Sequence, residues 1–135
     1  MSPLYLLDAN AISDAMKGQA NLVGKLASKS GSVITSVIVQ GEIHYGLDLL
    51  PLGKRRTDLE AKAASVLGSL SAEPVTETVA IHYAAIRSTL AKQGLVLGDN
   101  DFWIAATALS LGAILVSRDQ DFQQVPGLVV EDWTT

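Results

Sequence analysis

Short apolar runs alternate along this chain with longer stretches that show helical periodicity. Four short runs and a weaker fifth predict buried strands: Leu4–Leu7, Ser32–Thr35, Ala113–Ser117, Leu128–Val130 and, weakest, Pro74–Thr76. The longer stretches predict helices at Ala11–Lys17, Asn21–Ser28, Val37–Leu50, Lys54–Leu70, Thr78–Gln93 and Phe102–Leu111. Strands that alternate with helices predict an α/β fold, in which helices cover both faces of a parallel sheet.

The composition narrows the class of protein. With 135 residues, 48% of them hydrophobic, residues 1–135 are expected to form a single domain with a substantial core. No apolar run approaches the ~20 residues of a membrane span. No secretion signal opens the chain, so we expect a cytoplasmic protein that does not enter a membrane. The absence of cysteine excludes thiolate nucleophiles and thiolate metal sites.

The charge adds a constraint on partners. A net charge of −4, from 14 acidic and 10 basic residues, argues against a broad basic surface for nucleic acid. It does not exclude a nuclease, because acids gathered around one metal ion would give the same excess of acidic over basic residues. The short basic run Gly53–Arg56 is read either as solvated surface or as an RNA contact.

The first strand ends in an unexpected way. The segment "LLDANAIS", Leu6–Ser13, places Asp8 directly after an apolar run and Asn10 two positions later. Either residue could cap the following helix. Asp8 could instead point into a site, because parallel sheets bind ligands beyond the carboxyl ends of their strands.

Other acids occupy comparable positions. Asp119 follows the fourth strand, while Asp99 and Asp101 open the helix before it. Each also has a structural reading: Asp99 or Asn100 as a helix cap, Asp101 as a favourable charge in the first turn, and Asp119 as a turn former.

Glu42 is harder to explain structurally. It shares one helix face with uncharged neighbours at Ile38, Val39, Tyr45 and Gly46. A carboxylate in such a stripe is costly to bury unless something pairs with it. An edge position, with the carboxylate reaching solvent, is the alternative.

Carboxylates that converge on one pocket need a cation between them to remain ionised. Oxygen ligands suit Mg²⁺ or Mn²⁺, and such an ion can activate water for phosphodiester hydrolysis. Other chemistries lack their signatures, because "GxxxxGK" and "GxSxG" are absent. Neither His44 nor His82 has the second histidine of a helical zinc site.

Four blocks of the sequence resemble the PIN-domain ribonucleases, and specifically the VapC-type toxins of toxin–antitoxin pairs. They are "LLDANAIS", "ITSVIVQGEIHYGL", "DFWIAATAL" and "ILVSRDQDF". The resemblance maps the catalytic, metal-binding acids onto Asp8, Glu42, Asp101 and Asp119. It maps a supporting hydroxyl onto Ser36, and Asn10 is a further supporting candidate. Asp99 is an additional acid that departs from the family pattern, and it could tune metal binding or contact a partner.

The resemblance implies a five-stranded parallel sheet and a Mg²⁺- or Mn²⁺-dependent endoribonuclease. It also implies a homodimer, an RNA substrate and inhibition by a cognate antitoxin. Two alternatives remain: a PIN fold that only binds, and a haloacid-dehalogenase-type phosphatase, for which Asn10 stands where an acid is required. We further expect an antitoxin to lie along the apolar surface beside Val37–Leu52 and to insert an Arg or Lys among the four acids.

Overall fold

The computed structural model describes residues 3–135, which form five strands, six α-helices and one 3₁₀ helix. The strands are β1 (Tyr5–Leu7), β2 (Val33–Ser36), β3 (Ser71–Glu73), β4 (Ile114–Val116) and β5 (Val130–Glu131). The helices are α1 (Ala9–Met16), α2 (Ala20–Ser28), α3 (Val37–Asp48), α4 (Lys54–Gly68), α5 (Glu77–Lys92), α6 (Asp99–Leu111) and the 3₁₀ helix η1 (Gln120–Gln124).

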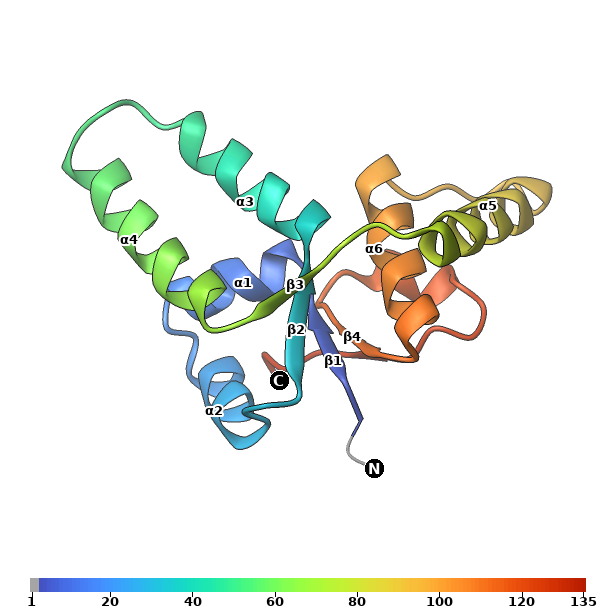
Figure 1. Cartoon of the computed structure of the whole chain (residues 1–135), viewed down its shortest axis with the longest axis horizontal. Helices are drawn as coiled ribbons and strands as arrows, with labels where there is room; N and C mark the ends of the chain where they lie inside the picture. The colour runs from blue at the N-terminus through green and yellow to red at the C-terminus, as the bar shows by residue number, and fades with distance from the viewer. Residues whose placement is uncertain (1–2) are drawn as a thin grey trace.

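All five strands pair in parallel in the order β3-β2-β1-β4-β5. In Figure 1, α5 and α6 lie on one side of the sheet, and α1, α2 and α4 lie on the other. The expected α/β fold with a five-stranded parallel sheet is therefore confirmed. The strand order reverses between β1 and β4, which is where such sheets commonly bind ligands.

The third strand and the start of α6 differ most from the expectation, and β5 lies at Val130–Glu131 rather than Leu128–Val130. The strand expected at Pro74–Thr76 lies instead at Ser71–Glu73, at the edge of the sheet. Pro74 cannot donate a backbone hydrogen bond, so pairing ends before it. Helix α6 begins at Asp99, three residues before the expected Phe102, and Gly98 occupies its N-cap position.

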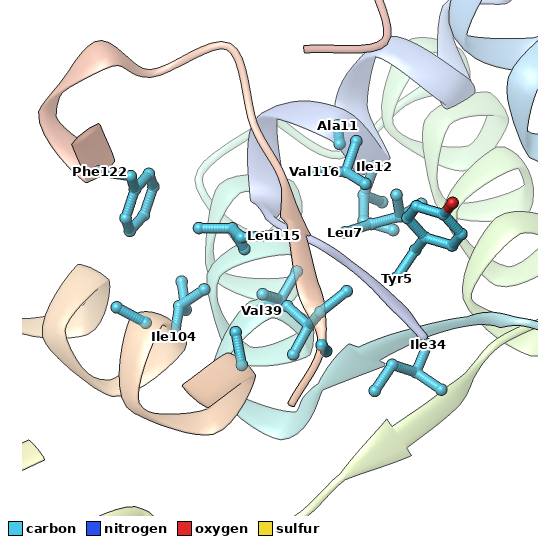
Figure 2. Close-up of a cluster of buried hydrophobic side chains, with 14 of the residues drawn as sticks. Tyr5, Leu7, Ala11, Ile12, Ile34, Val39, Ile104, Leu115, Val116 and Phe122 are labelled. Carbon is cyan, nitrogen blue, oxygen red and sulfur yellow. The ribbon is translucent and has the colours of Figure 1, made fainter. Parts of the chain in front are cut away.

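The core fills the space on both sides of the central strands. In Figure 2, Tyr5, Leu7 and Ile12 group on one side of β1, while Leu115, Phe122 and Ile104 group on the other. At the far end of the chain Trp133 is buried and packs against Tyr5, with ring centroids 5.2 Å apart. Its indole Nε1 donates to Glu131 Oε1 at 2.9 Å, which satisfies the polar atom of this core residue.

None of the helices within residues 3–135 has the length and apolar character that crossing a membrane requires.

Candidate active site

Asp8 both caps a helix and lies at the centre of the strand ends. Its Oδ1 accepts a hydrogen bond from the Ala11 backbone N–H at 2.8 Å, which caps α1. The residue is only 4% exposed. Burial raises the pKa of this carboxyl to about 6, and Asp101 and Asp119 add to the increase, although hydrogen bonds from Ser117 and Ala11 oppose it. The capping and site roles of Asp8 are therefore compatible.

Glu42 lies on α3, which leaves the carboxyl end of β2. Ser36 is buried and its Oγ accepts from the Val39 N–H at 3.1 Å, so the supporting hydroxyl acts as the cap of this helix. Glu42 Oε1 is buried and has no hydrogen-bond partner. Burial, followed by the charge of Asp101, raises the pKa of Glu42.

Asp101 lies in the first turn of α6 and faces the other acids. Burial raises its pKa, and the charges of Asp119 and Asp121 raise it further. The cap of α6 is Gly98, with no side-chain hydrogen bond, so neither Asp99 nor Asn100 caps this helix. A Cβ at Gly98 would lie 3.3 Å from Asp101 Oδ2. The glycine thus leaves room for the Asp101 carboxylate.

Asp119 follows β4 and caps η1. Its Oδ1 accepts from the Asp121 N–H at 2.9 Å, and its own N–H donates to Ser117 Oγ at 3.0 Å. Ser117 is buried, and its hydroxyl also lowers the pKa of Asp8, so this side chain acts on both Asp119 and Asp8. Sequence reasoning missed Ser117 and Asp121. The "DQD" spacing, which repeats the spacing of Asp99 and Asp101, could have indicated Asp121.

The four acids act on one another but have no protein cation. The charges of Asp101 and Asp119 raise the pKa of Asp8, and the charge of Asp8 raises that of Glu42. Every ion pair found within residues 3–135 involves other acids: Asp14–Arg118, Asp48–Arg56, Asp58–Lys54, Glu60–Arg56 and Asp99–Arg87. The carboxylates at the strand ends therefore form a negative cluster that the described part of the chain does not neutralise.

The other two supporting candidates, Asp99 and Asn10, are exposed and lie at the edge of the acid cluster. Asp99 is exposed and pairs with Arg87 Nη1 at 3.0 Å. It also accepts from the Tyr83 hydroxyl at 2.8 Å, so its charge is directed toward α5. Asn10 is exposed on α1 and lines a groove that reaches Glu42.

The site offers the donor atoms of a hard cation, although they are not yet arranged around one point. No three acidic or histidine side chains between residues 3 and 135 stand close enough to hold an ion as they lie. The donors themselves fit Mg²⁺ or Mn²⁺: they are carboxylate oxygens, one of them buried without a partner, and they lack a counter-charge. His44 is exposed and His82 is half-buried beside Ala85 and Ile86.

Two clefts meet at Glu42, one on each side of α3. In Figure 1, α3 leads away from the end of β2, with α1 and α4 on one side and α6 on the other. On the α6 side lies a cleft of about 470 Å³, hereafter the α3–α6 cleft; its lining is Val37, Ile38, Gly41, Glu42, Tyr45 and Asn100. On the other side lies a groove of about 360 Å³ formed by α1, α3 and α4, hereafter the α1–α3–α4 groove.

Comparisons with known proteins agree with this architecture. The family model described as "PIN domain" matches residues 5–128. The chain is 30% identical to Ribonuclease VapC1 of Haemophilus influenzae, over 97% of this chain and 98% of the relative. It is similar to the structure of DNA-bound VapBC from Salmonella typhimurium, with a TM-score of 0.89, 25% identity and coverage of 98% and 99%. It also resembles VapBC-5 of Mycobacterium tuberculosis, a member of a family of toxin–antitoxin systems, with a TM-score of 0.68, 25% identity and coverage of 96% and 97%.

Proposed function

This chain belongs to the PIN-domain family, and we propose that it is a VapC-type toxin that hydrolyses RNA phosphodiester bonds as a metal-dependent endoribonuclease. The observation that carries the proposal is the negative cluster of Asp8, Glu42, Asp101 and Asp119. These acids interact with one another at the strand ends and have no protein cation, whereas the ion-paired acids lie elsewhere. The likeness to a named ribonuclease over nearly the whole chain supports the same reading.

We assign the four carboxylates to holding a Mg²⁺ or Mn²⁺ ion. When bound, such an ion lowers the pKa of a water molecule and stabilises the charge that develops on the phosphoryl group. The chain's own residues prepare this position. Ser117 accepts a hydrogen bond from the Asp119 N–H and lowers the pKa of Asp8, and Ser36 fixes the first turn of the helix that carries Glu42. Burial keeps these carboxylates partly out of bulk water, where their interaction with a cation is stronger.

Incubation of purified protein with total cellular RNA tests the activity. With Mg²⁺ or Mn²⁺ present we expect endonucleolytic cuts whose mapped ends fall at defined positions, and with EDTA we expect none. An Asp8→Asn variant purified in parallel controls for contaminating nucleases. Intact RNA under all ionic conditions, with the protein folded, would instead support a PIN fold that only binds.

The α1–α3–α4 groove fits an antitoxin segment. Its lining is mainly apolar, and it also includes Glu42, Asn10 and Lys17. Lys17 lines this groove and also a neighbouring hollow, whose lining is Lys17, Lys54, Arg55, Asp58, Leu59 and Lys62. We therefore propose that a cognate antitoxin places apolar residues in the groove and an Arg or Lys among the acids, with acidic residues toward Lys17. An arginine would pair with carboxylates in bidentate geometry and exclude the metal.

Competition between metal and antitoxin tests this mode of inhibition. Raising Mg²⁺ should weaken antitoxin binding, and Asp101→Asn should weaken it as well, because each removes part of the negative charge that attracts the basic side chain. Calorimetric titrations at two Mg²⁺ concentrations measure both effects. An affinity indifferent to Mg²⁺ and to Asp101→Asn would show that inhibition works in another way.

We further propose that the toxin acts as a homodimer in the cytoplasm, where its RNA substrate would be found. Light scattering on the purified chain gives the oligomeric state directly.

A further inference from the structure

The α3–α6 cleft adjoins the proposed active site but has a different chemical character. Glu42 and Asn100 line it, and they also line a neighbouring hollow that contains Asp101. Whatever occupies the α3–α6 cleft therefore lies next to the acids. The remaining lining comes from one face of α3 and carries no charge.

An exposed aromatic ring borders this cleft. Tyr45 is 66% exposed, although it lies only three residues after Glu42 on α3. Val37, also partly exposed, lies two turns earlier on the same face. Asn100 contributes an amide from α6, which lowers the pKa of Glu42 through hydrogen bonding and has further donor and acceptor capacity for a ligand. The cleft thus combines an aromatic face, an apolar wall and one polar group that can pair with a base edge.

Gly41 keeps the cleft open. It lies within α3, where glycine costs about 1 kcal/mol relative to alanine. A Cβ built at this position would meet no other atom within 4 Å, so packing does not require the glycine. A larger side chain here would project into the space beside Glu42.

We infer that the α3–α6 cleft is a nucleobase subsite, in which an unstacked base of the RNA next to the scissile phosphate packs against Tyr45 and pairs with Asn100. The inference rests on the proposed function. A neutral base suits a cleft beside carboxylates, whereas a phosphate there would be repelled unless it bound the metal. Proteins hold single-stranded RNA by stacking bases on aromatic side chains. The subsite therefore predicts a preference for single-stranded RNA over duplex of the same sequence.

Kinetics on a short single-stranded RNA test the subsite. Because stacking of a base contributes about 1–3 kcal/mol, Tyr45→Ala should raise KM about tenfold with kcat little changed, while Tyr45→Phe should behave as wild type. Gly41→Leu should raise KM without loss of folding, since leucine favours a helix. Ile81→Ala is the matched control, because Ile81 is comparably exposed on α5 and lies outside the cleft. An unchanged KM in Tyr45→Ala and Gly41→Leu would overturn the inference.

A nucleoside titration separates this inference from the nuclease proposal, because it requires neither metal nor cleavage. Adenosine, guanosine, cytidine and uridine are each added to isotope-labelled full-length protein and followed by NMR. Amide shifts at Val37–Tyr45 and at Asn100 would support the subsite even if no RNA were cut. Shifts elsewhere, or none, would overturn it. Weaker antitoxin binding by Tyr45→Ala, with RNA kinetics unchanged, would likewise overturn it and identify a protein contact.

Discussion

Asp99 and Asp101 lie two residues apart in the first turn of α6, yet they have opposite surroundings. Asp99 is exposed and is paired with Arg87 and Tyr83 on α5. Asp101 is half-buried, and its neighbouring charges are Asp119 and Asp121. The chain thus neutralises one carboxylate of this turn and leaves the other among like charges. Under the proposed function, a cation from outside the chain would neutralise the strand-end acids that the chain leaves unpaired.

The same contrast holds between wider regions. The outer helices supply Lys54, Arg56 and Arg87 to nearby acids. The strand ends gather four acids, and burial together with the charges of neighbouring acids raises the pKa of three of them, Asp8, Glu42 and Asp101. Arrangements that cost stability without a structural gain are expected at functional sites.

The largest expected difference between the unpaired acid Asp101 and the paired acid Asp99 is in the rate of RNA cleavage. Asp101→Asn should lower the rate more than about a hundredfold, because loss of a group that only supports a metal ligand already costs 10- to 100-fold. Asp99→Asn, which removes the same charge from the same helix turn, should cost much less. Initial rates with one RNA and saturating Mg²⁺ measure both. Equal losses in the two variants would remove the distinction on which the account depends.

The second difference is in the pH dependence of stability without metal. An unfolded Asp8 ionises near its ordinary pKa of 3.8, whereas the folded one ionises at about 6. The folded chain therefore holds an extra proton between these values, and its stability falls as pH rises through them, by about 3 kcal/mol from this group. Asp8→Asn keeps the cap acceptor and should remove that part of the decline.

Chemical denaturation in EDTA at acidic and neutral pH measures the effect. Because the pKa values of Glu42 and Asp101 are also raised, some decline should remain in Asp8→Asn. Asp99→Asn is the control and should retain the full decline. A wild-type stability that instead rises between about pH 4 and 6 would contradict the assignment for Asp8.

A smaller effect is expected at the paired acid. Arg87→Gln leaves Asp99 without its cation and so makes it more like Asp101. Since exposed ion pairs contribute little, the free energy of unfolding should change by less than about 1 kcal/mol. Thermal denaturation measures this change. Lys92→Gln is the control, because it removes an exposed charge from the same helix. A loss of several kcal/mol in Arg87→Gln alone would show that this pair is structurally essential.

The smallest effects are expected at the histidines. His44 is exposed and His82 lines a separate hollow with Ala85 and Ile86. His44→Ala and His82→Ala should each keep RNA cleavage within about twofold, because neither ring belongs to the acid cluster. A large loss in the rate for either variant would point to a general acid or base that the account omits.

The sequence predicted those features that depend on local pattern. The α/β alternation gave the fold class, and the position of Asp8 after an apolar run indicated the strand ends. The hydrophobic pattern did not predict the position of β3, which depends on strand pairing. This strand forms before Pro74 because its partner β2 lies alongside Ser71–Glu73. The clefts around Glu42 and the pairing of Asp99 with Arg87 depend on helices far apart in the chain. No local signal could have predicted either.

The most direct test is to locate Mn²⁺ by anomalous diffraction in crystals of the wild-type chain, with Asp101→Asn and Asp99→Asn crystals grown in the same salt. We expect a metal peak among Asp8, Glu42, Asp101 and Asp119 that persists in Asp99→Asn and is lost or strongly weakened in Asp101→Asn. A wild-type crystal saturated with Mn²⁺ that shows no peak at these carboxylates, or a peak that Asp101→Asn leaves unchanged, would contradict this expectation.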